Sequence, residues 1–187
     1  NFVKKAQQEC GSIDLLVNNA GLALGVDHLA DADPQDWTTM MDVNFIGAMK
    51  MTRAILPFMK DHSGARIIHI ASIAGREAYE GGGGYCASKA AMKSMSRSLR
   101  LELLDRGIGV SCIDPGLVET EFSRVRFRGD EEKAKAVYAG VEALTAKDVA
   151  KTIAFVAMQE AHVNIDDVLI TPMAQGFTKR TIRKTQS

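Results

Sequence analysis

Tyr85 and Lys89 stand four residues apart, and Ser72 ends an apolar run at residues 67–71 upstream of them. A separation of four puts two side chains on one helix face, one turn apart. A free tyrosine has a pKa of about 10, and a lysine ammonium one turn away lowers that pKa by favouring the phenolate. The Ser72 hydroxyl, at a strand end, can hydrogen-bond a substrate oxygen beside the tyrosine. A Tyr-Lys pair alone is common on helix surfaces, but the three residues together predict proton transfer at a carbonyl or alcohol oxygen.

The composition is that of one globular domain. The chain has 187 residues, enough for a sizeable core, and its 23 basic residues balance its 23 acidic residues. A balanced charge argues against a nucleic-acid binder, and no apolar run reaches the length of a membrane span. We therefore expect a single domain over residues 1–187 with a C-terminal tail at 171–187, a small-molecule substrate, and neither nucleic acid nor membrane as a partner.

Cysteine and histidine residues show no metal-ligand spacing. The three cysteines are odd in number and scattered, as expected for reduced thiols in the cytoplasm. We expect no metal site. Cys86, beside Tyr85, is interpreted as a small buried apolar residue, with a reactive thiol as the alternative.

Strands and helices alternate along the chain. Short apolar runs predict strands at residues 13–17, 66–71, 108–113 and 168–170. Apolar positions at helical spacing predict helices at residues 34–61, 85–105 and 146–160. Asp33 before Pro34 is a candidate N-cap, and Thr145 with Asp148 resembles a capping box. This alternation predicts βαβ units and a parallel sheet.

Two loops follow predicted strands, where parallel α/β sheets bind their ligands. In the first, Asn18 and Asn19 precede Ala20 and Gly21, whose small side chains let a flat ligand approach the backbone. The Asn18 amide could also tie two strands together, and a plain turn is the alternative.

The second loop begins at Pro115 and Gly116, with Val118 and Thr120 just after. Its backbone groups could reach a carboxamide, and the Thr120 hydroxyl could reach a phosphate. An ordinary strand-ending turn is the alternative here. Asn44, within the helix at residues 34–61, could kink that helix and free a carbonyl to hold a water, or be a tolerated surface residue.

These motifs, taken in order, resemble the short-chain dehydrogenase/reductase family from residue 1 to about residue 175. The resemblance implies a Rossmann-type doubly wound parallel sheet. It implies that Tyr85 is the acid/base, that Ser72 polarises the carbonyl, that Lys89 binds the nicotinamide ribose, and that Asn44 holds a water in the proton relay. The implied cofactor-binding residues are Asn18, Asn19, Ala20, Gly21, Tyr85, Lys89, Pro115, Gly116, Val118 and Thr120.

A finer resemblance rests on residues 22–25, 121–130 and 161–165, and on Pro172 with Gln175. These segments are similar to the NADP-dependent 3-hydroxy acid dehydrogenases, which act on serine, allo-threonine and related acids. The resemblance implies NADP as cofactor, with NAD as the alternative. A 3-oxoacyl-thioester reductase is the rival within the family, and a non-catalytic fragment that serves as an assembly partner is the rival of another class.

One part of the family pattern is absent. The glycine-rich turn that seats the cofactor pyrophosphate at a helix N-terminus does not occur, nor do the strands around it. We therefore interpret the chain as the C-terminal portion of such a domain, whose first predicted strand would otherwise be a bare edge.

The segment after the second loop carries three arginines at alternate positions. Arg124, Arg126 and Arg128 would share one face if the segment were extended. A guanidinium can bind a carboxylate bidentately, so these residues are candidate substrate ligands together with Ser72 and Tyr85.

Assembly is the last expectation. The helices at residues 34–61 and 85–105 carry more methionines than one core face needs, and the resemblance implies that they pair into a homodimer or homotetramer. The methionine and leucine positions concerned are Met40, Met41, Met49, Met51, Met59, Met92, Met95 and Leu99. The resemblance also suggests that the basic tail at residues 179–184 reaches a neighbouring subunit.

Overall fold

A four-stranded parallel sheet forms the centre of the computed structural model, which describes residues 2–59, 61 and 64–184. Its strand order is β1 (Leu15–Asn18), β2 (Arg66–Ile70), β3 (Gly109–Pro115) and β6 (Asp167–Ile170). The register pairs Leu16 with Ile67, Ile67 with Val110, and Ile113 with Val168. Because all strands are parallel, their carboxyl ends meet at one edge.

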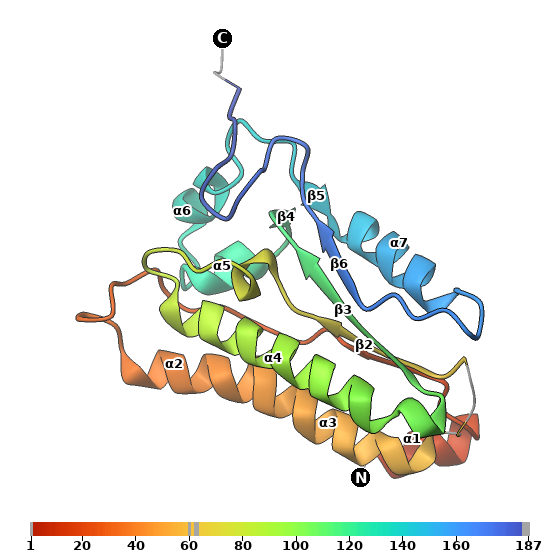
Figure 1. Ribbon diagram of the computed structural model, residues 1–187. Coiled ribbons are helices and arrows are strands. Elements are labelled where there is room, and N and C mark those ends of the chain that lie inside the picture. Colours follow the sequence, from red (N-terminus) through yellow and green to blue (C-terminus); the bar gives the residue numbers. More distant parts are fainter. Residues whose placement is uncertain (1, 60, 62–63, 185–187) are drawn as a thin grey trace.

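Helices cover both faces of the sheet (Figure 1). One face is covered by α2 (Pro34–Met41), α3 (Gly47–Ile55) and α4 (Gly83–Glu102), and the other by α7 (Ala146–Ala157). The remaining long helix, α1 (Phe2–Cys10), adds Val3 to the core between α3 and α4. The predicted doubly wound parallel fold is confirmed.

The strand β2 is buried along its whole length because helices pack on both of its faces. Ile67 lies in the cluster that includes Ile55 of α3 and Leu99 of α4. Ile68 lies in a different cluster, with Val156 of α7. Alternate residues of a strand point to opposite faces, and both faces here are apolar. The carboxyl end of β2 therefore holds Ser72 in a rigid position.

Two helix starts have the side-chain caps that the sequence predicts. The Asp33 carboxylate accepts a hydrogen bond from the Gln35 amide at 2.8 Å, and Thr145 and Asp148 form a reciprocal capping box. The helix predicted at residues 34–61 is interrupted by a π-helical turn, η1 (Asp42–Ile46), that contains Asn44. A 3₁₀ turn, η2 (Leu56–Phe58), follows α3.

Short elements fill the connections. They are η3 (Ile73–Gly75), η4 (Leu104–Arg106), β4 (Val118–Glu119), α5 (Phe122–Arg126), α6 (Glu131–Ala136) and β5 (Leu144–Thr145). The strands β4 and β5 form a second, two-stranded parallel sheet. The first predicted strand begins two residues late, at Leu15, because Ile13 forms an isolated bridge with Met59.

The C-terminal tail folds over its own chain beside α6 (Figure 1). Arg183 donates hydrogen bonds to the carbonyls of Val137, at 3.0 Å, and Ala139, and the Lys184 amide donates to the Gly140 carbonyl at 2.8 Å. At least one of the basic tail residues therefore binds helix-end carbonyls of this chain.

Some of the methionines expected at an assembly surface are buried within this chain. Met40, Met59 and Met92 are buried, as is Leu99, and among the named positions only Met51 is exposed. The half-buried and exposed methionines of these helices leave the expectation of assembly as a prediction. Within the described residues, no helix combines the length and apolar character of a membrane span.

Candidate active site

The predicted catalytic residues Ser72, Tyr85 and Lys89 lie at the carboxyl edge of the sheet. Tyr85 and Lys89 occupy the first turns of α4, and Ser72 is the N-cap of η3, directly after β2. The Ser72 hydroxyl accepts a hydrogen bond from the Ala74 amide at 3.1 Å and donates to the Pro115 carbonyl at 3.5 Å. All three side chains are buried, so water has little access to them.

Burial dominates the electrostatics of the site. It raises the pKa of Tyr85 to about 12, and hydrogen bonding to Ser72 and the positive charge of Arg126 oppose this rise in pKa. Burial also lowers the pKa of Lys89 to about 8. The Lys89 ammonium lies 5.8 Å from the centroid of the Tyr85 ring and donates to the Ile70 carbonyl at 2.9 Å. The predicted lowering of the tyrosine pKa by Lys89 is therefore not the dominant effect in this structure.

Asn44 is fully buried and fastens the loop after β1 to α4. Its amide group donates to the Leu22 carbonyl at 2.8 Å and to the Ser88 hydroxyl at 2.9 Å, and its oxygen accepts from the Leu22 amide at 2.7 Å. Gly21 passes so close that a Cβ there would lie 3.1 Å from both the Asn44 Oδ1 atom and the Lys89 Nζ atom. Asn44 is thus a buried structural clamp and not a surface residue.

The first predicted cofactor loop is open at its surface. Asn19, Ala20 and Gly21 are exposed, whereas Asn18 is buried and donates to the Thr52 hydroxyl at 2.9 Å. The Asn18 side-chain amide therefore joins the end of β1 to α3.

The C-terminal tail supports the second predicted loop. The Leu117 amide donates to the Gln175 side-chain oxygen at 2.8 Å, and a Cβ on Gly116 would lie only 2.2 Å from that oxygen. Pro115 is buried, Val118 is half-buried and Thr120 is exposed.

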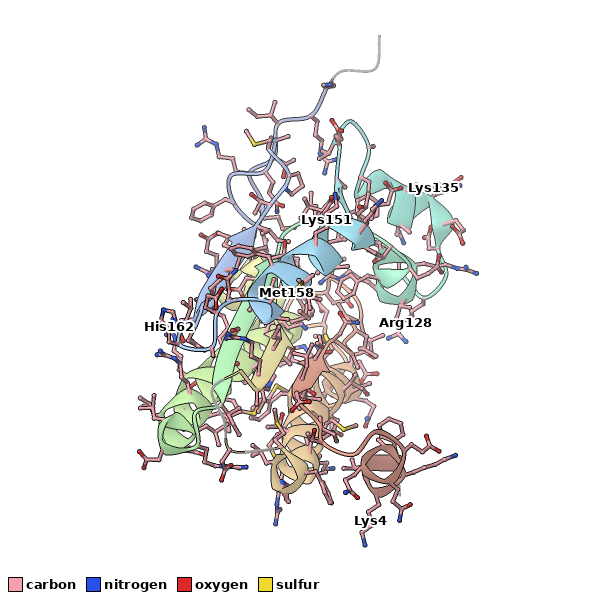
Figure 2. The ribbon with its side chains drawn as sticks, turned by 90° about the vertical axis from the view of Figure 1, so that its right-hand side faces the viewer. Lys4, Arg128, Lys135, Lys151, Met158 and His162 are labelled. Carbon is pink, nitrogen blue, oxygen red and sulfur yellow. The ribbon has the colours of Figure 1, made fainter. Side chains whose placement is uncertain are left out.

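The three arginines do not share a face, which corrects the extended reading of their segment. Arg124 and Arg126 lie in α5, where residues two apart point in different directions, and Arg128 lies in the turn after the helix. Arg124 pairs with Glu121 at 3.2 Å and with Glu131 at 3.0 Å. Arg128, labelled in Figure 2, pairs with Asp36 of α2 at 2.6 Å. Arg124 and Arg128 are thus each paired with a carboxylate of this chain.

Arg126 is the member of this set that faces the site. Its guanidinium carbon lies 5.0 Å from the centroid of the Tyr85 ring and 5.3 Å from that of Phe122. It also donates to the Tyr79 hydroxyl at 2.6 Å. The Phe122 ring packs on Tyr85 with centroids 5.4 Å apart, so α5 lies over the tyrosine as a lid. Sequence reasoning missed Tyr79, which is placed by the glycine-rich loop before α4.

A small pocket opens beside Tyr85, between the loop after β1 and the starts of α2 and α4. Its lining is apolar near the tyrosine and acidic toward solvent. The lining residues are Leu24, Gly25, Asp27, Ala32, Asp33, Asp36, Trp37, Met40, Gly81, Gly82, Gly84 and Tyr85. No group of three or more histidine, cysteine or acidic side chains among the described residues is arranged to hold a metal ion.

The sequence pattern of the short chain dehydrogenases matches residues 1–133. This chain belongs to that family. It is 44% identical over 182 residues to an NADP-dependent 3-hydroxy acid dehydrogenase of Schizosaccharomyces pombe, covering 97% of this chain and 70% of that protein. It is 45% identical over 174 residues to an NADP-dependent 3-hydroxy acid dehydrogenase of Salmonella typhi, covering 92% of this chain and 70% of that protein.

Two solved structures of serine dehydrogenases are similar to this chain. A closed form of serine dehydrogenase complexed with NADP+ superposes with a TM-score of 0.89 at 40% identity, covering 98% of this chain and 76% of that one. A serine dehydrogenase from Escherichia coli superposes with a TM-score of 0.78 at 37% identity, covering 94% of this chain and 71% of that one. The predicted family is confirmed.

The first predicted cofactor loop has space for a flat nicotinamide cofactor. The exposed main chain of residues 19–21 runs past Lys89, and Gly21 leaves the space that a Cβ would fill beside Asn44 and Lys89. Both predicted cofactor loops leave the carboxyl edge of the sheet, where ligands of such folds bind.

A buried charge cluster lies next to this site and was missed from the sequence. Asp114, at the end of β3, accepts hydrogen bonds from Lys93 of α4 and Arg76. Lys93 also donates to Asp167 of β6 at 2.9 Å. The cluster ties α4 and the loop after Ser72 to the strand that precedes Pro115.

Proposed function

We propose that this short chain dehydrogenase is an NADP-dependent oxidoreductase. It interconverts a small 3-hydroxy acid, of the serine, allo-threonine or 3-hydroxypropionate type, and its keto or semialdehyde form. The observation that carries the proposal is the buried placement of Tyr85 beside Ser72, one helical turn from Lys89, at the carboxyl edge of the sheet. The names of the similar proteins support the cofactor and the substrate class.

Tyr85 is the proposed acid/base. In the direction of oxidation it takes the hydroxyl proton of the substrate, and in reduction it returns that proton to the carbonyl oxygen. The Ser72 hydroxyl orients the same oxygen by a hydrogen bond. NADP, when bound, accepts or supplies the hydride. A cation near a phenol stabilises the phenolate, so Lys89 assists Tyr85.

Lys89 has a second proposed role, in holding the ribose of the cofactor. The proposed contacts with the rest of the cofactor are the main chain of residues 18–21, and Pro115, Gly116, Val118 and Thr120. Asn44 holds a water in the proton relay by accepting a hydrogen bond from it. Both side-chain N–H groups of Asn44 already donate, to Leu22 and to Ser88.

A panel of substrates tests the proposal in the full-length protein. We expect small 3-hydroxy acids to reduce NADP faster than NAD, and a 3-hydroxyacyl thioester to react poorly. Preference for the thioester would favour the rival 3-oxoacyl-thioester reductase. Absence of turnover with every substrate would favour the non-catalytic assembly partner.

We also propose a homodimer or homotetramer in the cytoplasm. Apolar side chains are exposed on α7 and just after it, where Figure 2 shows Met158, and at the end of α4 and the start of η4. They are Leu101, Leu104, Phe155 and Met158. Cys86 and Cys112 are buried free thiols, which supports a reducing compartment. A monomer by light scattering of the full-length protein at micromolar concentration would contradict the assembly.

A further inference from the structure

Arg126 is held among aromatic rings without an acidic partner. Its guanidinium lies 5.0 Å from the centroid of the Tyr85 ring, 5.3 Å from that of Phe122 and 5.9 Å from that of Tyr79. Within the described residues, no ion pair includes this side chain, whereas Arg124 and Arg128 of the same lid are both paired with carboxylates. Among the three arginines of this segment, the one that packs on the Tyr85 ring is therefore the one without a carboxylate partner.

The hydrogen bonding of Arg126 is incomplete as well. A guanidinium has five N–H donors. The Nη2 atom of Arg126 donates a hydrogen bond to the Tyr79 hydroxyl at 2.6 Å. Its Nε atom is buried and has no hydrogen-bond acceptor. The side chain is half-buried, and its cation–π contacts replace only part of the hydration that it loses. An anion bound beside Tyr85 would accept the remaining hydrogen bonds of the Arg126 guanidinium and neutralise its charge.

We propose that Arg126 binds the carboxylate of the substrate and that Tyr79 is the positioning residue that orients its guanidinium. This inference rests on the proposed function, and it assigns the substrate charge to one of the three candidate arginines. Tyr79 in turn is held from its other side by the tail, where the Lys179 ammonium lies 5.1 Å from the ring centroid.

The chemistry of the substrate class agrees with this placement. In a 3-hydroxy acid only two carbon atoms separate the hydroxyl-bearing carbon from the carboxylate oxygens, so one small site must hold both groups. Tyr85 and Ser72 hold the hydroxyl end, and the guanidinium that packs on the Tyr85 ring is the nearest cation of the lid. A thioester lacks the negative charge at this position, and it would leave Arg126 uncompensated. The same residue thus selects free acids.

The first test compares one acid with its own ester in the full-length protein. We expect Arg126→Gln to raise the KM for 3-hydroxypropionate at least ~10-fold, about 1.4 kcal/mol of binding, and to leave the KM for methyl 3-hydroxypropionate within ~2-fold. Arg126→Lys keeps the charge but not the fork and should give a smaller rise. Arg124→Gln is the matched control and should bind both compounds normally.

The second test concerns Tyr79. Tyr79→Phe keeps the ring and removes the hydroxyl that holds the guanidinium. A positioning role predicts a higher KM for the acid, by ~3-fold or more, with kcat within ~2-fold of wild type and the KM for the ester unchanged. An equal loss in kcat for acid and ester would show a merely structural role and would overturn this assignment.

Binding without turnover separates this inference from the proposed chemistry. Propionate carries the carboxylate but no hydroxyl, and its binding to the full-length protein with NADP can be followed by isothermal titration calorimetry. We expect Tyr85→Phe to bind propionate normally and Arg126→Gln or Arg126→Lys to bind it more weakly. If both Arg126 variants bind propionate and 3-hydroxypropionate like wild type, the carboxylate site lies elsewhere, whatever the role of Tyr85.

Discussion

The ammonium of Lys93 donates to the carboxylate of Asp114, which is completely buried at the end of β3. Arg76 and Asp167 extend the cluster next to the proposed active site, and the exposed Arg97 reaches Asp167 at 4.0 Å. Lys93 lies one turn beyond Lys89 on α4, and Asp114 directly precedes Pro115. The cluster therefore holds the proposed catalytic helix in register with the second cofactor loop.

Asp114→Asn should destabilise the protein strongly. It removes a charge and leaves Lys93 and Arg76 without their buried partner, which typically costs about 3–5 kcal/mol. Urea unfolding of the full-length protein measures this loss. Asp166→Asn, next to the cluster but in an exposed pair with Arg100 at 3.4 Å, is the control and should cost less than ~1 kcal/mol. Equal stability of the two variants would contradict this account.

Tyr85→Phe should abolish most of the activity without unfolding the protein. The substitution keeps the ring that packs against Phe122 and removes the proton-carrying oxygen. Loss of general acid–base catalysis lowers turnover by about 100-fold or more. Steady-state kinetics measure the effect, with thermal melting as the control for folding. Near-normal turnover would exclude Tyr85 as the acid/base.

Gly21→Ala should impair NADP binding and turnover with little loss of stability. The added Cβ would lie 3.1 Å from the Asn44 oxygen and from the Lys89 ammonium, and both would have to move by a few tenths of an ångström. Gly176→Ala is the matched control, because a Cβ there would meet nothing within 4 Å. Fluorescence titration with NADPH compares the two variants. Equal affinity would show that the loop tolerates the side chain.

Stability should fall as the pH drops below the ordinary pKa of histidine. His69 is fully buried between the hydroxyls of Thr52, at 3.5 Å, and Ser96, at 2.7 Å. Burial lowers its pKa from 6.5 to about 4. The His69 ring therefore stays neutral in the folded protein at a pH where the same ring takes up a proton in the unfolded chain. The stabilisation is complete above pH 6.5 and is lost toward about pH 4, on the order of 3 kcal/mol in total.

Urea unfolding at pH 7 and pH 4.5 measures this loss. His69→Gln should reduce the pH dependence relative to wild type, although it lowers stability at both pH values. His162→Gln, at an exposed position, should keep the wild-type dependence. An unchanged dependence in His69→Gln would mean that other groups dominate.

Local features of the chain were predictable from its sequence. The four-residue spacing of Tyr85 and Lys89, the Asp33 cap and the Thr145 capping box depend on neighbours within one turn, and α4, α2 and α7 confirm them. Both proposed cofactor loops could also be located from the sequence, because each follows a predicted strand. Parallel strands place their carboxyl ends at one edge of the sheet.

Only the tertiary structure decided which polar side chains meet. Arg128 pairs with Asp36, Lys93 pairs with Asp114, and Asn18 donates to Thr52. In each case the two residues come from elements far apart in the chain. The conformation of the lid was also decided there: Phe122–Arg126 form a helix that places Arg126 against the Tyr85 ring, whereas an extended segment would place all three arginines on one face. A hydrogen bond or an ion pair depends on positions within a few tenths of an ångström, and packing of the whole core sets those positions.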